Sequence, residues 1–529
     1  MSKKISTHSA LFPSWLRFLI IILLVIGVLL RFVNIDKKFY WPDEVFTSLR
    51  ISGYTVSEMN DQLGNGRVFS IEDLHKYQYP NPEKNTIDTI KGLISEESQV
   101  APLYFVMVRF WVEWFGNSIA VTRSFSAFIS LLTFPCLYWL CQELFESSII
   151  AWIAMALVAV SPIHLIYAQE ARAYSLWVVI TLISSAALLR AMRLKTKGAW
   201  SIYAVTLPLG FYTHLYFCFI ALAHGIYVVV IERFRLSKTL KNYLVSLLTG
   251  VIIFVPWILA IITHPAPGKV DWTNAKQTVL ASAIRWFGIV SRAFVDLGTT
   301  PNNLGKFQLI TLIIYILIIL SLIIYSIYFI YSKTSKPVWL FVLTLSGSVA
   351  LPLMLLDFVF QKRYGTTRYI LPSILGIQLA VAYLFSNKIT YITTKLWQKI
   401  LWSLLAFMVI MGGVTSCTLY SQATTWWNKI PERSEIYPRI AEIINQSNKP
   451  LLISDHGIKL QLLGHLLDPK VRFQFPPKSQ LPEITEGFTD VFLFDLFDDS
   501  EFLKAGVEKV YNSKLQQINK LLWKLSPKQ

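Results

Sequence analysis

The N-terminal stretch WLRFLIIILLVIGVLLRFV, residues 15–33, is apolar at nearly every position. A helix of about 20 apolar residues crosses the roughly 30 Å of hydrocarbon in a bilayer. The stretch is too long for the apolar segment of a signal peptide, and it lacks a small-residue cleavage site. It therefore predicts a first membrane-spanning helix that stays in the protein.

The composition extends this prediction to the whole chain. Of its 529 residues, 54% are hydrophobic and only 15% are charged. A soluble domain cannot bury so much apolar surface, so we expect a mostly α-helical, polytopic membrane protein with a smaller polar part. The net charge of +17 is expected to come from cytoplasmic loops, so no nucleic-acid partner is predicted. The four cysteines lie in apolar runs, which predicts neither a disulfide framework nor a metal site.

Windows of about 20 residues predict about eleven spans. Residues 102–115 begin with a proline and contain Arg109 and Glu113, which favours an interfacial helix over a further span. The predicted spans are 15–33, 119–142, 149–167, 172–191, 199–214, 216–232, 242–262, 307–331, 337–356, 368–386 and 399–420.

Loop charges predict the orientation of these spans. Lysine and arginine are concentrated before the first span and in alternate loops, near 190–199, 232–242, 332–336 and 387–399. By the positive-inside rule these segments are cytoplasmic. We therefore expect a bacterial inner (plasma) membrane protein whose first long loop, 34–118, and tail, 421–529, face the periplasm.

Two domains are predicted from this topology. Residues 1–420 form the transmembrane domain, with interfacial helices in loop 34–118. The polar tail, 421–529, has apolar segments at 450–454 and 490–494 that are typical of buried strands. Helical stretches at 435–447 and 457–467 alternate with them, so the tail is predicted to be a small α/β domain outside the membrane.

Trp41-Pro42-Asp43-Glu44 lies a few residues beyond the first predicted span. Carboxylates beside a membrane cavity are candidate functional residues. Asp43 is the predicted catalytic base, with Glu44 as its reserve. Two alternatives remain: Asp43 caps a short helix, or the two carboxylates hold a divalent metal ion. No other cofactor is expected.

Cations gather on the same predicted face. Arg172, in Gln169-Glu170-Ala171-Arg172-Ala173-Tyr174, opens a span where the helix dipole disfavours a positive charge. An anionic partner explains it, either Glu170 or an external phosphate. Arg363 and Arg368 occupy another outer turn, where arginines also snorkel to lipid headgroups. His214 ends a predicted span, either as a hydrogen-bonded helix-end residue or as a base.

These segments, in this order, resemble the GT-C glycosyltransferases of the protein O-mannosyltransferase and aminoarabinose-transferase type, which take sugars from polyprenyl phosphates. The resemblance covers roughly residues 15–420, and one departure is Val100-Ala101-Pro102, where the family commonly has His-Pro-Pro. The segments that carry it are Asp43-Glu44, Ala101-Pro102-Leu103-Tyr104, Arg123, Ser161-Pro162, Gln169-Glu170-Ala171-Arg172-Ala173-Tyr174-Ser175, Tyr212-Thr213-His214 and Arg368-Tyr369-Ile370-Leu371-Pro372.

The resemblance implies transfer of a sugar from a polyprenyl-phosphate donor to a hydroxyl or amine of a protein, lipid or glycan acceptor. The phosphate leaving group departs as an anion, so it needs positive charge to stabilise it and no acid to protonate it. The acceptor needs one base to remove its proton. A single displacement inverts the anomeric carbon, unlike a glycosidase with paired carboxylates. The predicted donor-phosphate ligands are Arg172, Arg363, Arg368 and Arg123, supported by Glu170, Tyr174, His214 and Tyr104.

Two other classes of function remain open. A lipid or solute transporter would carry ionisable residues near span centres and internal repeats. A non-catalytic membrane scaffold would use the outer domain for binding and would tolerate loss of Asp43.

Overall fold

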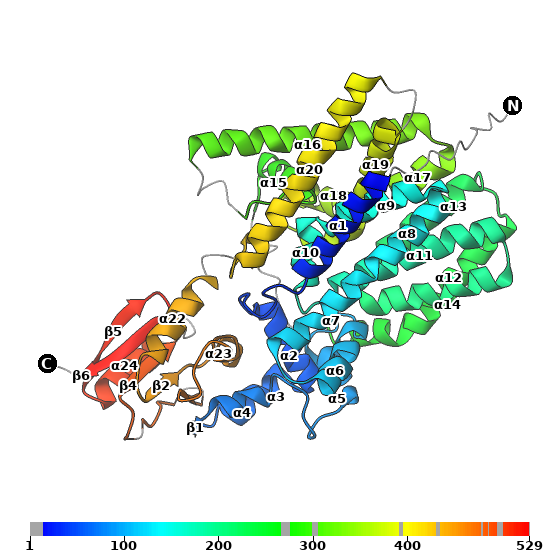
Figure 1. The fold of residues 1–529 in the computed structure, drawn as a ribbon. Coiled ribbons are helices and arrows are strands. Elements are labelled where there is room, and N and C mark those ends of the chain that lie inside the picture. The colour runs from blue at the N-terminus through cyan, green and yellow to red at the C-terminus, as the bar shows by residue number, and fades with distance from the viewer. Residues whose placement is uncertain are drawn as a thin grey trace. The chain divides into compact units, whose positions relative to one another are not determined.

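The computed structural model describes residues 14–265, 276–298, 305–390, 395–429, 434–477, 480–484, 486–494 and 501–527. The chain divides into two compact units (Figure 1). Unit 1 comprises Met1–Ile35, Arg123–Leu259 and Gly268–Ala423, and unit 2 comprises Asp36–Thr122, Ala260–Pro267 and Thr424–Gln529. Unit 2 thus joins the first long loop to the tail, which the sequence analysis had assigned to separate domains.

Unit 1 is helical. Its helices are α1 (Ser14–Leu30), α7 (Ile119–Leu131, which begins in unit 2), α8 (Thr133–Phe145), α9 (Ser148–Ala159), α10 (Pro162–Ala168), α11 (Tyr174–Leu194), α12 (Lys197–Thr213), α13 (Phe217–Ile231), α14 (Lys238–Thr263, whose end lies in unit 2), α15 (Val279–Ser291), α16 (Lys306–Lys333), α17 (Lys336–Gly347), α18 (Ala350–Phe360), the 3-10 helix η3 (Thr367–Ile370), α19 (Leu371–Thr390) and α20 (Leu396–Gln422).

Six helical segments in the described part of the chain are long and apolar enough to cross a membrane. Two bent helix pairs, α9 with α10 and α17 with α18, raise this number to eight if each pair is one span. Three shorter apolar helices, α1, α13 and α15, fall below that length. The prediction of a mostly helical, multi-pass membrane protein is therefore confirmed. The described residues contain six to eight candidate spans, compared with the eleven predicted.

Close packing in unit 1 depends on small residues and on one buried cation. A Cβ on Gly27 would lie 2.6 Å from the carbonyl oxygen of Ala159, so only glycine lets α1 approach α9 this closely. Arg31 is buried, and its guanidinium donates to the carbonyl oxygens of Gly27 (2.5 Å) and Ala159 (3.3 Å) and to Ser130 Oγ (3.1 Å). It thereby satisfies carbonyls at the ends of α1 and α9 that have no helical partner.

Unit 2 combines short helices with a mixed sheet. Its remaining helices are α2 (Pro42–Ser52), α3 (Val56–Leu63), α4 (Ile71–His75), α5 (Thr86–Glu96), α6 (Leu103–Phe115), the 3-10 helix η4 (Trp427–Lys429), α22 (Ile436–Asn445), α23 (Gly457–Gly464) and α24 (Glu501–Val510). Its strands are β1 (Val68–Phe69), β2 (Pro450–Ile453), β3 (Arg472–Gln474), β4 (Asp490–Phe494), β5 (Ser513–Asn519) and β6 (Leu522–Pro527).

The sheet has the strand order β1-β3-β2-β4-β6-β5, with β3, β2 and β4 parallel at its centre. Strand β2 is buried at every residue, because helices or other strands cover both faces of a parallel sheet. Leu452 belongs to one hydrophobic cluster, while Leu451 and Ile453 belong to another. The predicted strands and helices of the tail are thus confirmed, but the sheet also includes β1 from the first long loop.

Candidate active site

In unit 1, the segment that joins α10 to α11 carries Glu170 and Arg172. Gln169, which caps α10, donates from Nε2 to the carbonyl oxygens of Leu30 and Val33, both at 2.9 Å. Ser126 of α7 donates to the Arg172 carbonyl oxygen at 3.3 Å. The turn is therefore fixed to the end of α1 and to α7, which positions its side chains in advance of any ligand.

The side chains in this turn differ in exposure. Glu170 is buried, whereas Arg172 is half-buried and retains contact with solvent. Tyr174, the first residue of α11, is buried and lies 5.1 Å from Tyr167, centroid to centroid. Tyr167 is within electrostatic range of both Glu170 and Arg368. The turn thus lies near the second predicted cationic segment.

His214 connects the two segments. It follows the last residue of α12, and its ring stacks on the indole of Trp177 at 4.1 Å with an interplanar angle of 3°. The backbone N–H of Tyr216 donates to His214 Nδ1 at 3.2 Å, so the neutral ring carries its proton on Nε2. Arg172 and Arg368 lie within electrostatic range of the ring. Because Nδ1 accepts a hydrogen bond, the ring is neutral and donates from Nε2.

The third segment is the turn between α18 and η3. Asp357 is fully buried, and its carboxylate accepts from the backbone N–H of Tyr364 (2.6 Å) and Gly365 (3.1 Å). Arg285 pairs with the same carboxylate at 2.5 Å and also donates to the Gly365 carbonyl oxygen. Trp286 Nε1 donates to it at 2.9 Å. One buried carboxylate thus fixes the whole turn.

This fixed turn carries Arg363, whose side chain is exposed, and leads to Arg368 in η3. The Arg368 guanidinium lies 5.2 Å from the ring centroid of Tyr369. Burial and the positive charges of Arg285, Arg368 and Arg292 lower the pKa of Arg363, while Asp357 raises it less. Among described residues, none forms a hydrogen bond or ion pair with Arg363. Positive charge is therefore concentrated here.

Arg123, the fourth predicted phosphate ligand, is placed differently. It is fully buried, and its Nη1 donates to the Ile35 carbonyl oxygen at 2.7 Å. This bond holds the chain just past α1, so its geometry supports a positioning role.

In unit 2, the sequence Trp41-Pro42-Asp43-Glu44 opens α2. Pro42 is the first helical residue, a position whose N–H makes no hydrogen bond within the helix, so a proline is tolerated there. Glu44 is fully buried, and its Oε2 accepts from the Trp41 N–H at 3.1 Å. Asp43 is half-buried. The two adjacent carboxylates therefore have different environments.

A lysine 385 positions later in the chain forms an ion pair with Glu44. Lys429 Nζ lies 3.2 Å from Glu44 Oε2 and donates to the Phe39 carbonyl oxygen at 3.1 Å. Both side chains are buried, with 3% and 0% of their surfaces exposed. Tyr104 on α6 is also fully buried. Glu44 and Tyr104 thus belong to the interior of unit 2, and Asp43 is the carboxylate of the pair with access to solvent.

The sequence analysis did not identify Arg31, Arg285 or Lys429. The signal for Arg31 was an arginine at the end of an apolar run, where an unpaired charge is costly. Arg285 and Lys429 carry no comparable local signal. Among the described residues, no group of three or more His, Cys, Asp or Glu side chains is arranged to hold a metal ion.

Comparisons with known proteins concern one stretch of the sequence and the fold. Residues 99–259 match the sequence model of the dolichyl-phosphate-mannose-protein mannosyltransferase family. No curated protein sequence matches the chain significantly. ArnT from Cupriavidus metallidurans bound to undecaprenyl phosphate has a TM-score of 0.53 and 11% identity, covering 96% of this chain and 98% of that one. Its apo form has a TM-score of 0.52 and 12% identity, covering 97% and 98%.

At these identities the structural match shows the fold alone, and the fold is that of ArnT over nearly the whole length of both chains. The sequence match contains Tyr104, Arg123, Arg172 and His214. Together they confirm the predicted resemblance to the GT-C, polyprenyl-phosphate-sugar-dependent membrane glycosyltransferases.

Proposed function

We propose that this membrane glycosyltransferase, matched to the mannosyltransferase family over residues 99–259, moves one sugar from a polyprenyl-phosphate donor to a hydroxyl or amine group of an acceptor. The acceptor is a protein, lipid or glycan. The reaction takes place on the extracytoplasmic face of the inner membrane, and about eleven spans carry the chain across it.

The observation that carries this proposal is the cationic cluster of unit 1. The positive charges of Arg172 and Arg368 lie within electrostatic range of His214, and Arg363 lies within range of Arg368. Arg172 and the two later arginines come from distant parts of the sequence. Like charges repel strongly where water is partly excluded, so an anionic ligand would stabilise such a cluster. A phosphate fits, because guanidinium groups bind phosphate oxygens bidentately.

His214 adds a neutral donor to this cluster. Its Nδ1 is occupied by the Tyr216 N–H, which leaves Nε2–H for a phosphate oxygen. Stacking on Trp177 fixes the plane of the ring. The phosphate would therefore meet both charged and neutral donors without requiring proton transfer from the histidine.

The chemistry needs one base in addition to this cluster. The acceptor O–H or N–H attacks the anomeric carbon, the bond from that carbon to the phosphate oxygen breaks, and polyprenyl phosphate leaves as an anion. The acceptor proton passes to a carboxylate. We assign this role to Asp43 rather than Glu44, because Glu44 already accepts from Trp41 and Lys429. One displacement inverts the anomeric carbon.

Binding of a polyprenyl phosphate to the purified protein tests the donor site. Arg172→Ala is expected to weaken binding by about 10- to 150-fold, which corresponds to the roughly 1.5–3 kcal/mol of a charge-assisted hydrogen bond. Arg172→Lys should restore it only partly, since an ammonium cannot reproduce the bidentate contact. Arg193→Ala, which removes an exposed cation paired with Glu143, is the control.

The alternative, that Arg172 serves only as a partner of Glu170, has its own test. If it holds, the Glu170→Gln, Arg172→Gln double variant should bind polyprenyl phosphate as tightly as the wild type. Equal affinity in the wild type, the single variant and the double variant would remove Arg172 from the donor site.

Asp43→Asn tests the base. Loss of a general base lowers the rate by about 10² to 10⁴, while donor binding should be unchanged. Full activity of Asp43→Asn would refute the assignment, and loss of wild-type activity on addition of a chelator would favour the metal-dependent alternative.

A further inference from the structure

Unit 2 contains a pocket of about 420 Å³ formed by the end of α3, the turn after it, and α4. Seven of its eight lining side chains are polar. They include two carboxylates, two cations and two amides: Asp61, Asp73, Arg67, Lys76, Gln62 and Asn65. We propose that this pocket binds a neutral glycan portion of the acceptor, an assignment that rests on the proposed sugar transfer.

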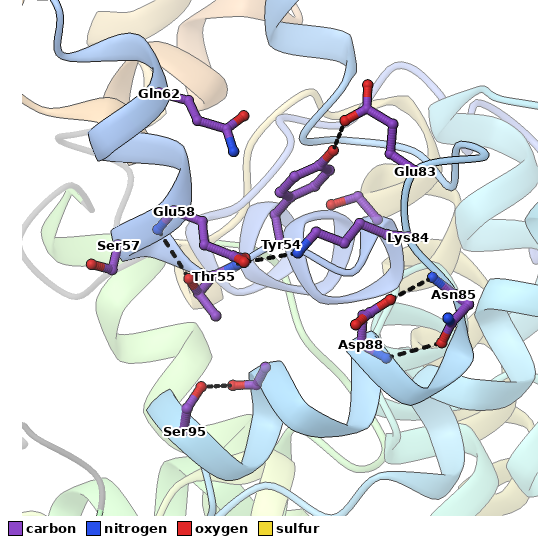
Figure 2. Close-up of polar contacts among 12 residues, drawn as sticks. Tyr54, Thr55, Ser57, Glu58, Gln62, Glu83, Lys84, Asn85, Asp88 and Ser95 are labelled. Carbon is purple, nitrogen blue, oxygen red and sulfur yellow. Dashed lines mark hydrogen bonds and ion pairs between the residues drawn. The ribbon is translucent and has the colours of Figure 1, made fainter.

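Part of the pocket lining, at Gln62, Lys76 and Tyr77, is held in place before a ligand binds. Tyr77 donates from its hydroxyl to Gln62 Oε1 at 2.8 Å, and its ring packs edge-on against Tyr54 at 5.0 Å. Tyr54 in turn donates to Glu83 at 2.8 Å, and Glu83 pairs with Lys76 at 2.7 Å. Figure 2 shows the bond from Tyr54 to Glu83. Fixed side chains lose little entropy on binding, which favours recognition by hydrogen bonds.

This network also determines which groups remain available. Gln62 uses its carbonyl oxygen for Tyr77, so its NH₂ group is the free donor. Asp61 is exposed, and no described residue forms a hydrogen bond or ion pair with it. Arg67 and Asp73 are 3.9 Å apart, a loose ion pair, and Asp73 Oδ2 also accepts from the N–H (2.8 Å) and the hydroxyl (3.2 Å) of Ser70. The Gln62 NH₂ group, the Asp61 carboxylate and the Arg67 guanidinium thus place donors and an acceptor at the pocket.

Sugar hydroxyl groups match this arrangement, because each one both donates and accepts. Carboxylates and amides bind two neighbouring hydroxyls at once, as they do other paired donors and acceptors. Both cations of the lining are paired, Arg67 with Asp73 and Lys76 with Glu83, which disfavours an anionic ligand such as a phosphate. The only apolar lining residue, Leu63, is fully buried, which disfavours a lipid chain.

The test is a glycan array that carries neutral oligosaccharides beside their sulfated and uronic-acid counterparts, probed with the full chain in lipid nanodiscs. Nanodiscs are needed because maltoside and glucoside detergents present sugar headgroups of their own. We expect binding to neutral glycans. Asp61→Asn should lower the affinity for the best of them about tenfold, the lower end of the effect of a hydrogen bond to a charged group.

Gln62→Glu is the second variant. It keeps an acceptor for Tyr77 but replaces the free donor with a negative charge, so it should also weaken glycan binding while leaving folding intact. Asp468→Asn, which changes an exposed carboxylate of the same unit outside the pocket, should bind as the wild type does.

The outcomes separate this proposal from the donor site. Loss of glycan binding in Asp61→Asn with unchanged polyprenyl-phosphate binding supports the pocket, whereas Arg172→Ala should show the reverse. No glycan binding, preference for the anionic glycans, or equal binding by wild type, Asp61→Asn and Gln62→Glu would overturn it.

Discussion

The buried ion pair between Glu44 and Lys429 gives the sharpest test of how the two neighbouring carboxylates divide their roles. Lys429→Met removes the cation that lies 3.2 Å from the Glu44 carboxylate. Breaking a buried pair by removing one partner destabilises a protein by about 3–5 kcal/mol, because the remaining charge stays buried. Glu44 retains its bond from the Trp41 N–H, so we expect the lower end, about 3 kcal/mol.

The double variant Glu44→Gln, Lys429→Met should recover most of this loss. The amide oxygen of the introduced glutamine would still accept from the Trp41 N–H, and neither buried group would be charged. Replacing a buried ion pair by neutral groups of similar size is often close to neutral in stability. We therefore expect a coupling energy of about 2–3 kcal/mol between the two sites.

Thermal unfolding of the purified wild type, single variants and double variant measures this coupling. For a unit of this size, 3 kcal/mol corresponds to a fall in Tm of roughly 6–12 °C. Lys37→Met is the control, since its pair with Asp36 at 3.5 Å is exposed and should be worth less than about 1 kcal/mol.

Activity of the double variant then separates structure from catalysis. If Asp43 is the base, a stable double variant should transfer sugar at a rate near that of the wild type. A stable but inactive double variant would make Glu44 catalytic. Equal Tm values in the wild type and Lys429→Met would refute the reasoning about the buried pair itself.

Two further predictions concern the proposed donor site and the orientation of the chain. Gly365→Ala should weaken binding of polyprenyl phosphate with little effect on Tm. A Cβ at this position would overlap the indole of Trp286 and displace the turn that carries Arg363. Unchanged affinity in a binding titration would contradict this prediction. A reporter that is active only in the cytoplasm should be silent when fused after Gln529, and a strong signal would reverse the predicted orientation.

The sequence by itself determined the elements whose signals are local. The run 15–33 predicts a membrane helix, and α1 occupies Ser14–Leu30. The apolar segments 450–454 and 490–494 become β2 and β4, which end within a residue of the predicted limits. These predictions succeed because apolar runs and their periods specify helices and strands without reference to the rest of the chain.

Sequence also predicted that the cations of the proposed donor site share one membrane face, but through topology and resemblance rather than contacts. It identified Arg172, Arg363 and Arg368 as residues at turns on one predicted face. The stacking of His214 on Trp177 and the buried Asp357 that fixes the Arg363 turn required the structure. Neither contact leaves a periodic signal, because each joins residues from separate helices.

Only the tertiary structure decided which polar groups are buried together. Lys429 pairs with Glu44 across 385 positions, and Val68 of β1 pairs with Gln474 of β3. A buried polar group must be satisfied by whichever partner the packing brings within about 3 Å. Any lysine of this chain has the charge needed to pair with Glu44. Which lysine does so depends on how apolar surfaces far apart in the sequence pack together, and no local sequence pattern predicts that.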